Sequence, residues 1–169
     1  MRGKYRLDPA DVLGVEVRVQ PRSIELSGIR DPRDGIQTKF SIYFATSAAL
    51  VYGRATLRQF DNSYVDDPEI RALMDRTTLI PDTSMDWYRS ELRIKTRGGR
   101  ILVQPVNLRE LWSDRRRAES QLSEKFRDLA GMILPADRVS RLGWLTGRLE
   151  DVEDLRELTR EWAQPPGQA

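Results

Sequence analysis

The strongest constraint on the fold is an uncharged stretch within residues 37–53, QTKFSIYFATSAALVYG. No charged residue occurs from Ile42 to Tyr52, and apolar or small side chains recur at helical spacing, which predicts a helix buried on most sides. This stretch is far shorter than the roughly 20 apolar residues of a bilayer-spanning helix, so it indicates the core of a soluble domain. Asp34 or Thr38 can begin the helix, and Gly53 can end it. The recurring positions are Phe40, Tyr43, Phe44, Ser47, Ala48 and Val51.

A strand is expected before this helix. Three valines between residues 15 and 19 alternate with polar residues, which is typical of a strand with one buried face, and Pro21 ends it. A single helical turn capped by Asp8 should precede the strand. Gly and Pro residues between positions 22 and 34 indicate a loop that carries the chain to the central helix.

A hairpin is expected after the helix. Two alternating segments, 87–96 and 100–106, flank the turn signal Arg97-Gly98-Gly99. We expect Leu92 and Ile94 of the first strand to share a face with Ile101 and Val103 of the second.

The remaining elements complete an α+β fold, with a small, mainly antiparallel sheet packed on the buried helix. Asp67-Pro68 opens a helix that runs through Met74, and residues 77–80 form a brief strand candidate. We therefore expect a lid-type α+β domain over residues 1–112. Helices should follow over residues 113–163, and the last six residues, 164–169, should be a disordered tail.

The predicted C-terminal helices carry three apolar stripes, and Pro135 separates the first two helices. We expect the segment from Gln121 to Trp162 to be an interface, because soluble monomers seldom leave contiguous apolar patches of this size in water. The stripes are Leu122, Phe126, Leu129 and Ile133; Val139, Leu142 and Leu145; and Val152, Leu155, Leu158 and Trp162.

Charge and composition exclude several classes of function. The 28 basic residues face 26 acidic ones, so the net charge is only +2 and no nucleic-acid partner is expected. The basic run Arg115–Arg117 is better explained as a solvated loop than as a phosphate-binding patch. Acidic residues 150–154 suit a helix start better than a metal site. The absence of Cys and His argues against zinc sites and imidazole-activated nucleophiles. Neither a signal peptide nor a membrane span is expected, so the cytoplasm is the expected location.

Three segments of the chain, taken in order, resemble the C-terminal part of the MmgE/PrpD family. They are the opening LDPADVLGVEVRV, the run GIRDPRDGIQTKFSIYFATSAALVYGRATLRQF and the ending LSEKFRDLAGMILPADRVSRLGWLTGRLEDVEDLRELT. The family includes 2-methylcitrate dehydratase, cis-aconitate decarboxylase and iminodisuccinate epimerase. By this resemblance the chain is a lid domain with the family's last helices, which pack on a large N-terminal helical domain. The family's catalytic histidines lie in that helical domain and just before the lid.

The entrance of the central helix holds the candidate site. An ammonium, a hydroxyl and a phenol near a helix start could bind or polarise a carboxylate, and an arginine in the adjacent turn adds positive potential. The alternative is structural, with the lysine solvated, the serine capping the helix and the tyrosine in the core. Many family members resemble Lys-Phe-Ser-x-Tyr-His at this point. Here Phe44 stands in place of the histidine, so the chain lacks that titratable group. The candidate substrate-binding residues are Lys39, Ser41, Tyr43 and Arg33.

The resemblance implies a substrate site for small di- or tricarboxylates, in a dehydratase, decarboxylase or epimerase that uses no cofactor. No catalytic residue is assigned to this chain, so it should be inactive alone. A separately encoded helical domain could complete it as a split enzyme, or the chain could be a fragment that self-associates instead. The alternative is a non-catalytic module, derived from the family, that binds small acids or another protein.

Overall fold

The computed structural model describes residues 2–163 and divides into two units, Met1–Arg109 and Glu110–Ala169. We call them unit 1 and unit 2. The predicted disordered tail, 164–169, lies outside the described residues.

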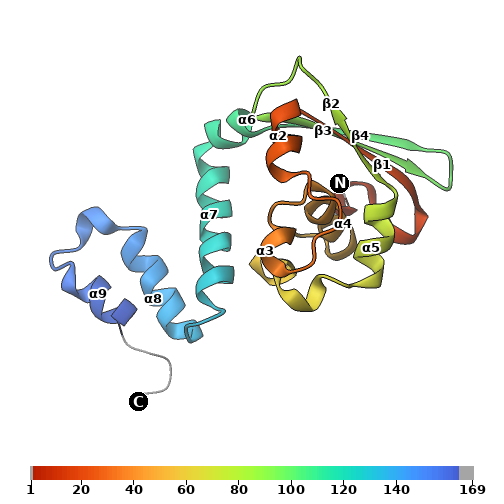
Figure 1. Cartoon of the computed structure of the whole chain (residues 1–169). Coiled ribbons are helices and arrows are strands. Elements are labelled where there is room, and N and C mark those ends of the chain that lie inside the picture. Colours follow the sequence, from red (N-terminus) through yellow and green to blue (C-terminus); the bar gives the residue numbers. More distant parts are fainter. Residues whose placement is uncertain (1, 164–169) are drawn as a thin grey trace. The chain divides into compact units, whose positions relative to one another are not determined.

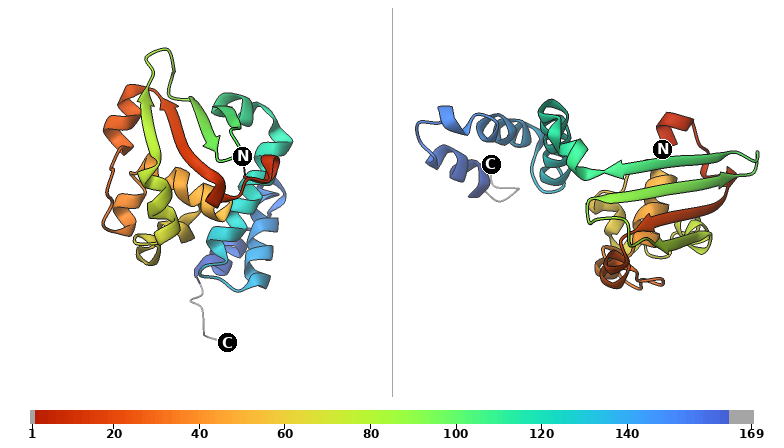
Figure 2. Two further views of the ribbon diagram at one scale, coloured as in Figure 1. Left: turned by 90° about the vertical axis from the view of Figure 1, so that its right-hand side faces the viewer. Right: turned by 90° about the horizontal axis from the view of Figure 1, so that it is seen from above.

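A four-stranded sheet organises unit 1 within the described residues, in the order β2-β1-β3-β4 (Figures 1 and 2). β1 pairs in parallel with β2 and antiparallel with β3, which pairs antiparallel with β4. The α+β class is therefore confirmed, and the sheet is mixed rather than wholly antiparallel. The strands are β1 (Val12–Val19), β2 (Thr77–Pro81), β3 (Arg89–Thr96) and β4 (Ile101–Asn107).

The predicted hairpin forms, but the predicted sharing of faces is wrong by one residue. Ile94 lies opposite Leu102, and both side chains are buried. Ile101 and Val103 point to the other face, where they are 62% and 39% exposed. Because side chains alternate between faces, a shift of one residue exchanges the inner and outer sets.

The central helix is confirmed as α4 (Ile42–Tyr52). Its N-cap is Ser41, not Asp34 or Thr38, and Gly53 ends it in the left-handed conformation with a φ of 76°. Phe40 lies before the helix and is 51% exposed, so it does not belong to the buried set. The buried residues of α4 are Phe44, Ser47, Ala48, Leu50 and Val51.

The core of unit 1 lies between the sheet and the helices α4 and α5 (Pro68–Asp75), which cover one of its faces (Figures 1 and 2). The predicted apolar side of α5 is buried, and Asp67 caps the helix as expected. The largest of the fully buried side chains here are Phe44, Ile70 and Ile94.

The loop predicted over residues 22–34 is partly helical. Pro21 occupies the first turn of α2 (Pro21–Ser27), and the Gln20 side chain caps it by accepting from the Ser23 amide. Asp34 then caps a short helix, α3 (Gly35–Thr38). The other short elements of unit 1 are α1 (Arg2–Tyr5), η1 (Pro9–Asp11), η2 (Leu57–Phe60) and η3 (Asn62–Tyr64).

Unit 2 is helical. Its helices begin with α6 (Leu108–Ser113), which contains the division between the units, and continue with α7 (Arg115–Ala130), α8 (Ala136–Thr146), η4 (Leu149–Asp151) and α9 (Arg156–Ala163). The run Arg115–Arg117 is exposed as predicted, but it forms the first turn of α7 rather than a loop, because Asp114 caps that turn. Among the described residues, no helix has the length and apolarity to cross a bilayer.

Candidate functional site

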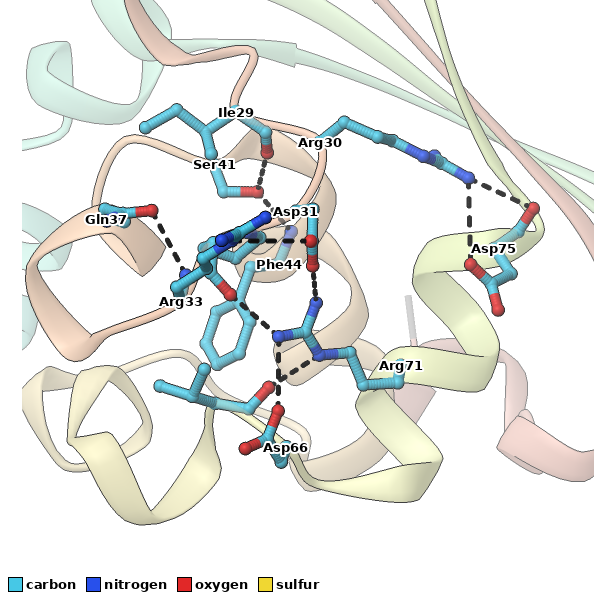
Figure 3. A network of polar contacts seen from close by, with 12 residues as sticks. Ile29, Arg30, Asp31, Arg33, Gln37, Ser41, Phe44, Asp66, Arg71 and Asp75 are labelled. Carbon is cyan, nitrogen blue, oxygen red and sulfur yellow. Dashed lines mark hydrogen bonds and ion pairs between the residues drawn. The ribbon is translucent and has the colours of Figure 1, made fainter.

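The loop from Gly28 to Ser41 carries Arg33, Lys39 and Ser41 and is closed at its neck. Gly28 and Ser41 form an isolated β-bridge, and the Ile29 amide donates to the Phe40 carbonyl over 3.2 Å. The Ser41 hydroxyl also donates to the Ile29 carbonyl over 2.6 Å (Figure 3). Both ends of the loop are therefore fixed at the entrance of α4.

Arg71, on α5, fastens this loop from below (Figure 3). Its guanidinium donates to Asp31 Oδ1 over 2.6 Å and to the Pro32 carbonyl over 2.7 Å. Its Nε donates to the Val65 carbonyl over 2.7 Å, and Asp66 lies at 3.4 Å. Sequence reasoning missed this residue. Its position on α5, outside the apolar side of the helix and beside acidic residues, was the available signal.

Gly35 brings the loop against the following segment. Its amide donates to Asn62 Oδ1 over 2.7 Å, and a Cβ at this position would lie 2.5 Å from the Phe60 carbonyl oxygen. The Thr38 hydroxyl is buried and donates back to the Gly35 carbonyl over 2.7 Å. This close approach leaves no room for a side chain at position 35.

Ser41 is buried and acts as the N-cap of α4. Its hydroxyl accepts from the Phe44 amide over 3.1 Å while it donates its proton to the Ile29 carbonyl. Lys39 and Ser41 therefore lie just before the first helical turn and not on it, since the helix begins at Ile42. In this conformation Ser41 can support the site only by positioning its neighbours.

Arg33 and Lys39 extend from the outer side of the loop. The Arg33 side chain is 83% exposed, and its Nε lies 3.9 Å from Asp31 Oδ2, a loose contact. Lys39 is exposed and makes no side-chain hydrogen bond or ion pair with any residue that the structure describes. Both cations are thus available to an anion in solution.

Tyr43 lies on the first turn of α4, half-buried against the core. The Arg30 guanidinium stacks over its ring at 4.5 Å from the centroid. Arg30 is held in turn by the Thr77 carbonyl at 2.8 Å and by an ion pair with Asp75 at 4.0 Å. Within the described part of the chain, the Tyr43 hydroxyl has no hydrogen-bond partner. The ring is therefore fixed and its hydroxyl is unused.

Tyr52, at the other end of α4, is a second polar phenol. It donates a short hydrogen bond to Asp67 Oδ2, and this contact, followed by partial burial, raises the pKa of Tyr52 to about 12. Asp67 also caps α5 through the Glu69 and Ile70 amides. A phenol that holds its proton so firmly is a structural link between α4 and α5 rather than a base.

Together, the loop and the helix entrance offer two exposed cations and one phenol on a fixed backbone. Such groups can hold carboxylates and donate a hydrogen bond to a developing negative charge. Within the described residues, no hydrogen bond, ion pair or cation–π contact joins Arg33, Lys39 and Tyr43 to one another. They are presented from one loop and the helix that follows it.

The chain is similar to known proteins along most of its length. Residues 1–150 match the MmgE/PrpD C-terminal domain. The cis-aconitate decarboxylase of Mus musculus is 29% identical over 130 residues, which covers 73% of this chain and 26% of the relative. The chain thus spans about a quarter of the length of that relative. On the match over residues 1–150, the chain belongs to the MmgE/PrpD family, as a representative of its C-terminal domain.

Proposed function

We propose that the chain forms the lid-type wall of a substrate site for small di- or tricarboxylates, in a lyase or isomerase that works without a cofactor. The observation that carries this proposal is the fixed loop, which presents Arg33 and Lys39 to solvent and leads into the helix that carries Tyr43, a phenol with an unused hydroxyl. A loop held at its neck and by Arg71 can keep these groups in place before a substrate arrives, which lowers the entropic cost of binding.

In this proposal, Lys39 and Arg33 hold substrate carboxylates, and Tyr43 donates a hydrogen bond where negative charge develops. Ser41 orients Tyr43 by capping α4. The reaction class is removal or addition of water, carbon dioxide or a proton at a carbon next to a carboxylate. Such chemistry needs a base, which we do not assign to this chain, because it has no histidine, Tyr52 is engaged with Asp67, and Tyr43 serves as a hydrogen-bond donor.

The base is therefore assigned to a helical domain that lies outside this sequence, on a separate chain or in a longer polypeptide. The similarity to a decarboxylase of which this chain covers about a quarter supports that assignment. The second candidate function is a non-catalytic module that binds small acids. It is favoured by the number of internal contacts that the loop already satisfies, such as those of Ser41 and Arg71.

The test is a titration of the purified chain with citrate and cis-aconitate, followed by chemical-shift mapping. We expect weak, saturable shifts around residues 33–43 and no turnover by the chain alone. Lys39→Ala should weaken binding about tenfold, as expected for the loss of one charged contact. Lys125→Ala, an exposed lysine in unit 2, is the matched control.

Two outcomes separate the candidates. Binding at residues 33–43, together with turnover that appears only when a histidine-bearing helical domain of the family is added, supports the enzyme. Binding that never leads to turnover with such a domain supports the non-catalytic module. Turnover by this polypeptide alone, lost on changing Lys39 or Tyr43, contradicts the assignment of the base to another domain.

A further inference from the structure

A polar pocket lies in unit 1, and none of the residues of the candidate site lines it. It has a volume of about 310 Å³ and lies between the segment before β1 and the turn of the β3–β4 hairpin. We propose that this pocket binds a small zwitterion of the α-amino acid class. The lining residues used in the argument are Arg6, Asp8, Asp11, Thr96, Gly98 and Arg100.

The charged side chains of this pocket do not neutralise one another. Arg6, Arg100 and Asp11 make no side-chain hydrogen bond or ion pair with any residue that the structure describes. Asp8 uses one carboxylate oxygen, Oδ1, to accept from the Ala10 amide at 3.0 Å. Cations and anions thus line one small space while their charges stay available to a ligand.

The two walls of the pocket are tied together by backbone contacts. The Arg97 amide donates to the Asp11 carbonyl over 2.8 Å, and its Nε donates to the Ala10 carbonyl over 3.1 Å. The hairpin turn is closed by the Thr96 amide, which donates to the Arg100 carbonyl over 3.0 Å. The pocket is therefore a fixed feature of unit 1, and its charged side chains are not needed to close it.

The backbone conformation of Arg6 also supports a ligand site in this pocket. Its φ is 47°, and among the described residues it is the only non-glycine with a positive φ. Strained conformations of this kind persist where surrounding structure holds them, and they are concentrated at ligand-binding positions. Here the strain lies in the wall of the pocket.

The balance of charge selects the ligand class. Two arginines and two aspartates contribute equal and opposite formal charges. The aspartates therefore repel a simple anion, and the arginines repel a simple cation. An α-amino acid carries both charges within a few bonds, so its carboxylate can pair with an arginine while its ammonium pairs with an aspartate. The volume is at the low end for small-molecule sites, which suits a ligand of this size.

Glutamate and glutarate test this proposal on the full chain, because they share two carboxylates and differ in the ammonium group. Chemical-shift titration should show saturable changes at residues 5–11 and 96–100, with glutamate bound about tenfold more tightly than glutarate. Asp11→Asn should remove that preference, and Arg100→Gln should weaken both ligands about tenfold. Arg22→Gln, which removes an exposed arginine on α2, should change neither affinity.

Three results would overturn the proposal. They are equal affinity for glutarate and glutamate, a preference for glutamate that survives Asp11→Asn, and the absence of saturable shifts at both segments. Thermal melts of each variant show whether the fold is retained; since the side chains are exposed, we expect it to be. Lys39→Ala distinguishes this pocket from the proposed carboxylate site, because it should leave glutamate binding here unchanged.

Discussion

Unit 1 holds most of the buried apolar residues of the described chain, whereas unit 2 buries few and exposes many large apolar side chains. Of the buried apolar residues in the described chain, 16 lie in unit 1 and 3 in unit 2, the latter being Val139, Leu142 and Leu145 of α8. Unit 2 nevertheless exposes eight large apolar side chains. They are Trp112, Leu122, Met132, Ile133, Trp144, Leu149, Leu155 and Trp162.

We therefore expect unit 1 to be stable by itself and unit 2 to be completed by a partner. A groove of about 690 Å³ between α7 and α8, lined by Leu122, Phe126 and Val139, adds to the exposed apolar surface of unit 2. Ion pairs from Arg138 and Arg141 to Glu161 fasten α9 to α8, at 3.7 and 2.8 Å. Polar contacts therefore help to hold α9 on α8.

The largest expected effect is association through unit 2. Burying half of its eight exposed apolar side chains is worth roughly 6 to 12 kcal/mol, at about 1.5 to 3 kcal/mol each before ordering costs. We expect light scattering to detect self-association of the purified chain, or a complex when a helical partner is added. The double variant Leu122→Gln and Ile133→Gln should reduce association, whereas Leu26→Gln in unit 1 should not.

Hydrogen exchange can contradict this prediction of association through unit 2. A stable monomer whose residues 121–162 are strongly protected from exchange, with no partner present, would mean that unit 2 needs no binding partner. The two units would then differ in composition but not in whether they are stable alone.

The next effect concerns the core of unit 1. Phe44→Ala should lower the free energy of unfolding of unit 1 by about 4 kcal/mol, because a fully buried ring is replaced by a cavity. Leu142→Ala is the matched change in unit 2. If the units are independent, each variant should lose hydrogen-exchange protection only in its own unit. Loss of protection in both units from either variant would mean that the units do not fold independently.

A smaller effect is expected when Arg71 is removed. Arg71→Ala leaves the Pro32 and Val65 carbonyls and the Asp31 carboxylate without their donor, which should cost about 2 kcal/mol. Exchange should accelerate in residues 29–41 and remain unchanged in unit 2. Arg54→Ala, an exposed arginine just after α4, serves as control. Unaltered exchange in the loop would show that its neck alone holds it.

The smallest effect is that of Tyr52→Phe, at most about 1 kcal/mol, because the phenol is 39% exposed and solvent screens the contact. The pKa of Tyr52 is raised from 10.0 to about 12, so its contribution is fully present below pH 10 and is lost as the pH rises through 12. The stability difference between wild type and variant should therefore narrow over that range in urea unfolding. Tyr5→Phe is the control, and a difference that stays constant with pH would contradict the link to Asp67.

The sequence pattern predicted the parts of the fold that depend on local periodicity. The central helix, the Asp67 cap and the hairpin followed from spacing and turn residues. The hairpin faces could not be predicted, because Ile101 and Val103 are apolar although they point outward on an edge strand. Apolar alternation alone does not say which set faces the core.

The candidate site was predictable only in part. Tyr43 and the exposed cations followed from the helix entrance and the family resemblance. The contacts of Arg71 with Asp31 and Pro32 could not be deduced, because they join residues about 40 positions apart in the chain. Nor could the sequence show that the Ser41 hydroxyl donates a hydrogen bond to the Ile29 carbonyl.

The closed neck of the Gly28–Ser41 loop also affects which insertions the sequence can accept. Because Ile29 and Phe40 are joined by a backbone hydrogen bond, an insertion at the exposed Arg33 between them need not move α4 or the sheet. Doubling the length of a flexible loop costs only about 0.6 kcal/mol of closure entropy. Insertions beside Arg33, before the anchored Gly35, could therefore alter the reach and shape of the loop while the core sequence stays the same.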